Sequence, residues 1–477
     1  MRSLNILLLV AVAAVPALSQ ERPAETEVVT YKDQIAPILR KHCGNCHNSD
    51  EPKSDLNLMT YQTLMAGGSS GESIAPGSAD QSLLYRLVSH QQEPAMPLRQ
   101  PKLADNELAL IAKWIERGAP ETTSSAAKIS VRKTEMDLSA IKTDKPSGAA
   151  AMPESWAPYE LPSTLRAAAV TALDASPWAP LFAVSGHECI QLYNADNFEL
   201  VGAIPFPEGV VHVLKFSRDG EVLLAAGGRG AEQGLVVLFD VRSGKRLAEI
   251  GDEYDSVLAA DINNDQSLVA LGGPSKLVKV FSTQTGKQLY EIKKHTDWIT
   301  SLEFSPDGNY LASGDRNGGA FIWESTSGGI VYTLGDHKDM ITQTSWRADS
   351  QMLATSSEDG RVILWYAEDG FPARSINAHA ASNNERPNPR QKLPGVLSVR
   401  FARSGDFATV GRNFSVKVWG NGGAQNLATF EDLQQIPSRV CVTHDGTRVI
   451  AGDLAGTMRV WDIKSKMLVK EFSTRAD

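Results

Sequence analysis

The stretch ITSLEFSPDGNYLASGDRNGGAFIWESTSGGIVYT, residues 299–333, decides the fold of most of this chain. It holds four short runs with the composition of β-strands, separated by turn-forming residues. Ser305-Pro306-Asp307-Gly308 joins the first two runs, and Asn317-Gly318 precedes the third. The stretch is therefore expected to form a four-stranded antiparallel sheet with strands at 299–304, 310–312, 320–323 and 330–333.

Aromatic residues at the equivalent place indicate that this unit repeats. Successive anchors lie 42 to 54 residues apart, and most intervals are 42 residues. A period near 42 with four strands per unit is typical of β-propellers, in which each sheet must stack on its neighbours to bury its faces. Residues 166–475 are expected to form an all-β propeller of seven blades. The seven anchors are Tyr193, Phe239, Phe281, Trp323, Trp365, Trp419 and Trp461.

This region resembles WD40 repeats over residues 166–475. Trp461-Asp462 is an intact Trp-Asp pair, and His337 with Asp359 and Trp365 matches the hydrogen-bonded set of that family. His295 begins a weaker set with Asn317. The resemblance implies that these histidines are buried and hydrogen-bonded rather than catalytic, and that the propeller docks other proteins.

Two insertions and two cysteines interrupt the regular pattern. Gly227–Gly234 is expected to lengthen a hairpin of the second blade, and Ala380–Gly395 to form a polar loop between the fifth and sixth blades. Cys189 and Cys441 fall on different strands of the first and last blades. Two buried free thiols are expected there, with a ring-closing disulfide as the alternative. The last blade is expected to contain all four of its own strands, with 467–472 as the outer one.

The N-terminal residues are those of an export signal. Arg2 precedes the apolar run 6–15, and Ala17-Leu18-Ser19 has the small residues of a cleavage site. Residues 1–19 are therefore expected to be a signal peptide, with an uncleaved anchor as the alternative. The mature chain is expected to be soluble and periplasmic, or otherwise extracytoplasmic.

The segment Cys43-Gly44-Asn45-Cys46-His47 is a haem-attachment motif. Two thiols three positions apart can form thioethers to the two vinyl groups of one porphyrin, and the next residue brings an imidazole beneath the iron. Cys43 and Cys46 are thus expected to hold one haem c covalently, with His47 as the proximal iron ligand. A zinc half-site and a redox-active dithiol are the competing interpretations.

The distal ligand must come from elsewhere in the chain. Met96 lies between Pro94 and Pro97, in a loop that proline stiffens, and is the expected ligand; His90 is the alternative. Met59 and Met65 are expected to pack in the core. A helix is expected from Asp105 to Gly118, with Trp114 packing on a first helix over 31–42 that Pro37 kinks or delays.

Residues 28–120 resemble the planctomycete-type cytochrome c domain. The resemblance rests on Ile35–Leu39, the haem motif, Gly67–Gly71, Met96-Pro97 and Trp114–Pro120. In that family Met-Pro carries the distal ligand, which supports Met96. The family commonly has a second proline where this chain has Leu98. The resemblance implies a small all-α, class I-like cytochrome c domain, here placed at 20–120 and joined to the propeller by a flexible linker at 121–165.

The expected function is electron transfer with a redox protein partner. The formal net charge of −9 and the lack of basic blocks argue against a nucleic-acid partner, and no stretch is long and apolar enough for membrane insertion. An enzyme is less expected, because the inner strands offer isolated charges and only His212 as a candidate base. The alternatives are a haem-linked oxidoreductase with a substrate site in the propeller, and a haem-based sensor.

Overall fold

The computed structural model describes residues 29–122, apart from 50, 51, 70, 72, 78 and 81, and residues 166–475, apart from 380–393 and 432. Between them it describes 136, 145–146, 148–154, 156, 159–161 and 164. The expected signal peptide, 1–19, lies outside the described residues. The chain forms two compact units, Met1–Val131 and Arg132–Asp477, so the boundary falls inside the segment expected to be a linker.

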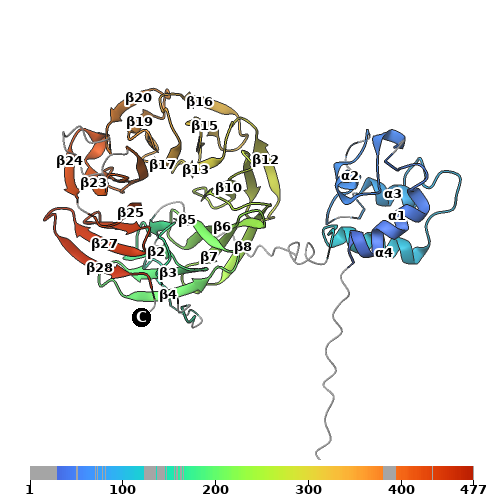
Figure 1. Cartoon of the computed structure of the whole chain (residues 1–477), viewed down its shortest axis with the longest axis horizontal. Helices are drawn as coiled ribbons and strands as arrows, with labels where there is room; N and C mark the ends of the chain where they lie inside the picture. Colours follow the sequence, from blue (N-terminus) through green and yellow to red (C-terminus); the bar gives the residue numbers. More distant parts are fainter. Residues whose placement is uncertain are drawn as a thin grey trace, which may run out of the picture. The chain divides into compact units, whose positions relative to one another are not determined.

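The first unit is a small helical fold, as expected (Figure 1). A π-helical turn, η1 (Tyr31–Ile35), runs into α1, because Pro37 fits the first turn of an α-helix, where no backbone N–H is required. Pro37 therefore delays the α-helix rather than kinking it. The helical elements are η1, α1 (Ala36–Cys43), η2 (Lys53–Asp55), α2 (Tyr61–Ala66), α3 (Leu83–Val88) and α4 (Asp105–Glu116).

Helix α4 holds the first unit together through its apolar face. Trp114 is fully buried, and its ring lies 6.2 Å from that of Tyr31, as expected for packing on the first helical segment. The indole Nε1 donates to the Pro120 carbonyl at 2.9 Å, so the large ring is buried with its polar atom satisfied. Near the other end of α4, Glu107 accepts from Lys41 at 3.1 Å and contacts His42 at 3.1 Å, which fixes α1 beside α4.

The second unit is a seven-bladed propeller within the described residues, which confirms the predicted fold (Figure 1). Each blade is a four-stranded antiparallel sheet of consecutive strands, and every aromatic anchor lies on the third strand. The blades are β1–β4 (Leu173–Ala175, Leu181–Ser185, Cys189–Asn194, Leu200–Pro205), β5–β8 (Val210–Phe216, Val222–Arg229, Gln233–Asp240, Arg246–Glu253), β9–β12 (Ala259–Ile262, Leu268–Gly272, Val278–Ser282, Gln288–Ile292), β13–β16 (Ile299–Phe304, Tyr310–Asp315, Ala320–Glu324, Ile330–Leu334), β17–β20 (Ile341–Trp346, Met352–Ser357, Val362–Tyr366, Pro372–Ile376), β21–β24 (Val396–Phe401, Phe407–Gly411, Ser415–Trp419, Asn426–Phe430) and β25–β28 (Pro437–Val442, Arg448–Asp453, Thr457–Asp462, Leu468–Ser473).

The first strand of each blade faces the centre of the ring and contacts the first strands of the two neighbouring blades. Apolar side chains fill the space between blades. Between the fourth and fifth blades, Ile322, Ile341 and Trp365 are at most 2 % exposed. Burial of each such side chain contributes about 1.5–3 kcal/mol. Stacking of neighbours thus supplies the core that a single sheet lacks.

The ring closes between β1 and β25 without exchange of a strand, because the first and last blades each contain four consecutive strands. The Val170 N–H donates to the Asp453 carbonyl at 3.0 Å, and the Ser438 hydroxyl donates to the Val170 carbonyl at 2.6 Å. Farther out, the Tyr193 and Phe472 rings lie 5.0 Å apart. Backbone, hydroxyl and aromatic contacts therefore close the seam.

Two expectations about irregular segments are confirmed. Strands β6 and β7 form an extended hairpin through 227–234, and Cys189 and Cys441 are both buried and free. The expected loop at Ala380–Gly395 lies almost entirely outside the described residues.

Trp156, from the segment before the propeller, donates its indole N–H to the Val241 carbonyl at 3.0 Å and so docks on the second blade.

Candidate functional site

The haem-attachment motif begins at the last residue of α1. The Cys46 and His47 amides donate to the Cys43 carbonyl at 3.1 and 3.0 Å, which winds the motif into a tight turn. Cys43 is half-buried and Cys46 is exposed, and neither forms a disulfide. Burial, together with the charge of Cys46, raises the pKa of the Cys43 thiol to about 11. Both thiols are thus available for covalent attachment of a cofactor.

The His47 ring is oriented by one hydrogen bond. Its Nδ1 lies 3.1 Å from the Leu56 carbonyl oxygen. A carbonyl only accepts, so Nδ1 is the donor of this bond, and Nε2 takes no part in it. The Leu58 amide donates to the His47 carbonyl at 3.0 Å and holds the backbone beside this contact. A histidine whose second nitrogen is fixed in this way is suited to ligate a metal.

Partly exposed apolar side chains accompany the motif. They pack against the core of the first unit without being fully buried by it, and several of them are Met or Tyr. Because large apolar groups tend to be covered in a folded protein, such side chains are suited to cover an apolar cofactor such as a porphyrin. The side chains are Cys43, Leu56, Met59, Tyr61, Met65, Tyr85 and Met96, with Leu110 and Ala112 on α4.

Met96 and His90 lie in one loop and contact each other. The Met96 amide donates to the Leu87 carbonyl at 3.0 Å, which ties the loop to the end of α3. The Nε2 atom of the exposed His90 lies 3.1 Å from the Met96 carbonyl, so Nε2 is the donor. His90 therefore holds the backbone at Met96. Met59 packs outside this loop, beside the haem-attachment motif. Its sulfur would lie 3.4 Å from a Cβ built on Gly44.

Arg86 was missed by sequence analysis. It lies on α3, one residue before the carbonyl that binds Met96, and its Nε is buried without a hydrogen-bond partner. A buried guanidinium nitrogen with a free N–H is suited to an anionic group such as a haem propionate. No local signal in the sequence distinguishes Arg86 from other arginines. The motif, the apolar side chains and Arg86 together fit a covalently bound haem.

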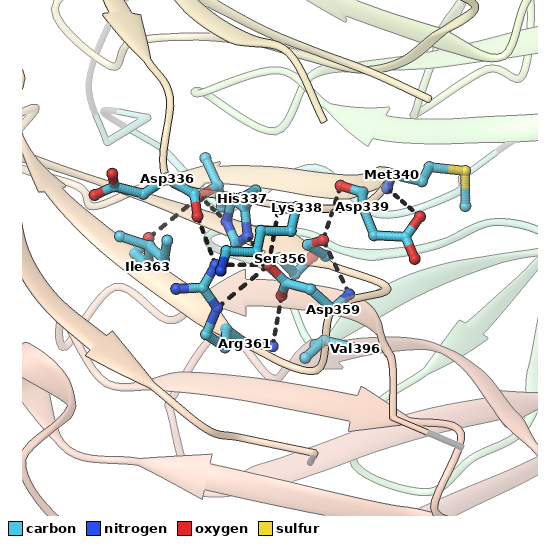
Figure 2. A network of polar contacts seen from close by, with 12 residues as sticks. Asp336, His337, Lys338, Asp339, Met340, Ser356, Asp359, Arg361, Ile363 and Val396 are labelled. Carbon is cyan, nitrogen blue, oxygen red and sulfur yellow. Dashed lines mark hydrogen bonds and ion pairs between the residues drawn. The ribbon is translucent and has the colours of Figure 1, made fainter. Parts of the chain in front are cut away.

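His337 is buried and hydrogen-bonded, as expected for a structural histidine. His337 Nδ1 contacts Asp359 at 3.0 Å, and its Nε2 contacts the Thr355 hydroxyl at 2.8 Å, to which the Trp365 indole also donates at 2.8 Å. Figure 2 shows Arg361 reaching the same carboxylate, at 2.9 Å. The hydrogen bonds from His337 and Arg361 hold the pKa of Asp359 well below its usual range, despite burial that raises it.

The expected pairing of His295 with Asn317 is wrong. His295 Nδ1 contacts Asp315 at 2.8 Å, and its Nε2 contacts the Ser313 hydroxyl at 2.7 Å. Asn317 instead donates its backbone N–H to Asp315 at 2.9 Å. The Asp315 carboxylate accepts hydrogen bonds from the His295 imidazole and from the backbone of the turn that follows it. It is therefore a better partner for His295 than the Asn317 side-chain amide.

A third set, around His379, was not predicted. Its Nδ1 contacts the Asn413 side-chain oxygen at 2.7 Å and its Nε2 contacts the Thr409 hydroxyl at 2.9 Å. The Trp419 indole donates to the same hydroxyl at 3.0 Å. Complete burial lowers the pKa of His379 to about 3, so the ring is neutral at physiological pH.

The charges expected to be isolated on the inner strands instead meet in one buried network. Glu303 of β13 contacts Lys215 at 3.1 Å and Arg400 at 3.5 Å, and Arg400 donates to Asp174 at 2.7 Å. Asp261 also faces this network and accepts from the Phe304 amide at 2.8 Å. Because these residues come from blades far apart in the sequence, their pairing could not be seen there.

His212 lacks the partner that a general base requires. Burial, with the nearby charge of Arg439, lowers its pKa. Within the described part of the chain, no acidic side chain is hydrogen-bonded to its ring, and no cluster of three or more His, Cys, Asp or Glu side chains is arranged to hold a metal ion. Among the described residues, no helix combines the length and apolar composition needed to cross a membrane.

Comparison with known families agrees with this division of the chain. Residues 43–98 match the family model for planctomycete cytochrome C, and residues 286–324 and 328–366 match the model for the WD domain, G-beta repeat. The two WD matches end in the blades that carry His295 and His337. A comparison with curated proteins found no match. A cytochrome c-type domain implies a haem electron-transfer role, and WD40 propellers are generally binding platforms.

Proposed function

We propose that this chain, in which a planctomycete cytochrome C domain precedes a seven-bladed WD40 propeller, is an exported electron-transfer protein that docks a redox partner through its propeller. The single observation that carries the proposal is the orientation of His47. Its Nδ1–H is committed to the Leu56 carbonyl at 3.1 Å, immediately beside two free cysteines, which leaves Nε2 for iron.

In this proposal Cys43 and Cys46 hold one haem c through thioether bonds, and His47 is the proximal ligand. Haem iron supplies one-electron chemistry between its two oxidation states. The partly exposed apolar side chains cover the porphyrin and exclude water, while Arg86 offers its buried N–H to an anionic edge. Each of these residues positions the cofactor and none transfers a proton to a substrate.

Met96 is proposed as the distal ligand in preference to His90. The Met96 side chain is partly buried against the core, whereas His90 is exposed and donates Nε2–H to the Met96 carbonyl. A methionine ligand would raise the haem potential and would keep exogenous ligands from the iron. His90 then acts as a positioning residue for the loop.

Export and docking complete the proposal. The features of an export signal at 1–19 support a location outside the cytoplasm, where c-type cytochromes typically occur. The proposed domain limits are 20–120 and 166–475, with a linker at 121–165 between them. The propeller is proposed to recognise a partner protein rather than to catalyse a reaction. Among the described residues His212 has no acidic partner, and the histidines of the three hydrogen-bonded sets described above are structural.

The test is visible absorption spectroscopy of the haem-loaded chain, oxidised and reduced, before and after carbon monoxide is added. Methionine ligation is expected to give a weak band near the red end in the oxidised form and no response to carbon monoxide. Met96→Ala is expected to lose the band and to bind carbon monoxide. Met65→Leu, which changes another partly buried methionine of the same unit, is the matched control and is expected to keep the wild-type spectrum.

Other outcomes would point to the alternatives. A high-spin wild-type spectrum that shifts with carbon monoxide would contradict the electron-transfer proposal and favour a haem-based sensor or a haem-linked oxidoreductase. A band that survives in Met96→Ala and disappears in His90→Gln would make His90 the distal ligand.

A further inference from the structure

A cavity of about 60 Å³ lies within the ring of inner strands, near the positions where these strands begin. Its lining includes His212 and Lys215 of β5, Gln343 of β17 and Arg439 of β25. One water needs about 10–15 Å³ of such volume, so the cavity has room for about four waters or a small polyatomic ion. Among the described residues that line it, there is no carboxylate.

Arg439 is the cation of this cavity that lacks an acidic partner. Its one hydrogen bond to a described residue runs from Nη1 to the Ser438 carbonyl at 3.0 Å, on its own strand. Lys215, in contrast, is held by Glu303 at 3.1 Å. Burial lowers the pKa of Arg439, although its side chain stays partly exposed, and no carboxylate lines this cavity among the described residues. An anion in the cavity would supply the missing counter-charge.

Arg400, another arginine of the inner strands, differs from Arg439 in having acidic partners. Arg400 also lines the channel, at a second cavity near the ends of the same strands. It donates to Asp174 at 2.7 Å and contacts Glu303 at 3.5 Å, so its charge is compensated within the protein. Arg400 is therefore paired with carboxylates of the protein, whereas no carboxylate lines the cavity at Arg439 among the described residues.

Gln343 lines the cavity and offers a second donor. Its Oε1 accepts from the Ser398 hydroxyl at 2.6 Å and from the Val399 amide at 3.2 Å. A backbone N–H can only donate, so this oxygen assignment is fixed and neither contact uses the Gln343 NH₂ group. Within the described chain, that NH₂ group has no hydrogen-bond acceptor.

His212 occupies a position that carries a hydroxyl in other blades. The strand register shifts at His212, Thr300, Thr342 and Ser438. Thr300, Thr342 and Ser438 donate to backbone carbonyls of the next blade, at 2.5 to 2.7 Å. His212 makes no such contact with the described residues, so its ring nitrogens remain for a group inside the cavity.

We propose that this cavity binds a small oxyanion, with Arg439 as its charged anchor and Gln343 and His212 as further donors. A guanidinium recognises an oxyanion through paired N–H groups, and an amide donor beside it adds direction. Phosphate and sulfate are of the size that the cavity admits. The site lies in the propeller and is independent of the haem proposal.

The test is titration calorimetry of the full haem-loaded chain with inorganic phosphate at constant chloride concentration. Saturable binding is expected for the wild type. Arg439→Leu is expected to weaken binding at least about tenfold, because a charge-assisted contact is lost. Arg316→Gln, which removes an exposed arginine of the same unit, is the matched control and is expected to bind like the wild type.

Thermal unfolding gives a second readout. Phosphate is expected to raise the melting temperature of the wild type and of Arg316→Gln, and to leave that of Arg439→Leu unchanged. If Arg439→Leu does not fold, Arg439→Lys replaces it and is expected to bind phosphate more weakly than the wild type. Absence of saturable binding in the wild type, or equal binding by the Arg439 variants, would overturn the proposal.

Discussion

Three histidines of the propeller each form the same kind of hydrogen-bond relay. In each relay, the groups at the two ends decide which atoms donate. The Trp365 indole can only donate, and it donates to the Thr355 hydroxyl. The Asp359 carboxylate can only accept, so His337 presents Nδ1–H to it and receives the Thr355 hydroxyl proton at Nε2. At His379 the same order runs from the Trp419 indole through the Thr409 hydroxyl and the imidazole to the Asn413 oxygen. Burial lowers the pKa of His379 to about 3, so its ring is neutral, and a proton added at Nε2 would face the Thr409 hydroxyl hydrogen.

At His379 this argument predicts a pH dependence of stability. Its folded-state pKa of about 3 lies below the usual 6.5, so the unfolded chain binds one more proton between these values and stability falls as pH falls. From pH 7 to 5 the wild type is expected to lose about 2 kcal/mol more than His379→Gln. Urea unfolding at the two pH values measures the difference.

His187→Gln is the control for this experiment, because His187 is exposed. It is expected to show the same loss as the wild type over the same pH range. Equal losses in the wild type and in His379→Gln would show that His379 is already protonated in the folded protein at pH 5.

Residue-scale features can be predicted where the chemistry is local in sequence. The proposed haem motif is five adjacent residues, and the contact of His337 with Asp359, which the structure confirms, spans 22 residues, a separation set by one blade. His379 lies 34 residues from its partner, because an insertion intervenes, and that partner is Asn413 rather than an aspartate. The Leu56 carbonyl that orients His47 carries no side-chain signal at all, so only the folded chain reveals it.

At the scale of elements, the extended hairpin of the second blade depends on close backbone approach. A Cβ at Gly227 of β6 would lie 1.9 Å from the Val210 carbonyl oxygen of β5. Gly227→Ala is therefore expected to destabilise the propeller by about 1–3 kcal/mol, as overpacked sites do. Denaturant unfolding followed by tryptophan fluorescence measures this change.

Gly335→Ala is the matched control for the hairpin variant. A Cβ at Gly335 would meet no atom within 4 Å. Its effect on the free energy of unfolding is expected to stay within about 0.5 kcal/mol. A Gly227→Ala chain as stable as the control would mean that β5 and β6 are not held as close as the structure has them.

Strands were predictable because alternation and turn residues coincide, as in β13 and β14, whose first residues match the expected ones. The register shifts on the inner strands were not predictable. They occur at Thr300, Thr342 and His212 alike, so no residue type marks them. Such shifts follow from the packing of neighbouring blades around the centre, which a single strand's sequence does not encode.

At the scale of the whole molecule, two compact units predict two separable unfolding transitions. Phe472→Ala removes a ring that packs on Tyr193 across the seam, at 5.0 Å. We expect it to lower the melting temperature of the propeller transition and to leave the haem transition unchanged. Far-UV circular dichroism and haem absorbance, recorded in one thermal scan, distinguish the two.

Leu468→Ala, on the same strand β28, is the control, because Leu468 is 50 % exposed. It is expected to shift neither transition measurably. Coincident loss of both signals in the Phe472→Ala chain would show that the two units unfold as one.

The number of blades was predictable because the period repeats seven times, and the split into a helical unit and a propeller because composition and motifs change along the chain. The charge distribution in the channel was not. Arg400 and Asp174 form an ion pair across 226 residues of sequence. Arg439 lacks such a partner because none of the described residues that line its cavity is acidic. Long-range geometry of this kind is decided by ring closure.

The seam between β1 and β25 also bears on how the ring is assembled during synthesis. Since every blade is one continuous segment, a ribosome delivers complete blades in order, and each can stack on its predecessor as soon as it emerges. Only the interface between the first and last blades must wait for the C-terminal strands. The entropy cost of closing the ring arises at that step, when the other six blade interfaces are already formed. The seam is thus the last joint made in biogenesis and the natural place for the ring to open.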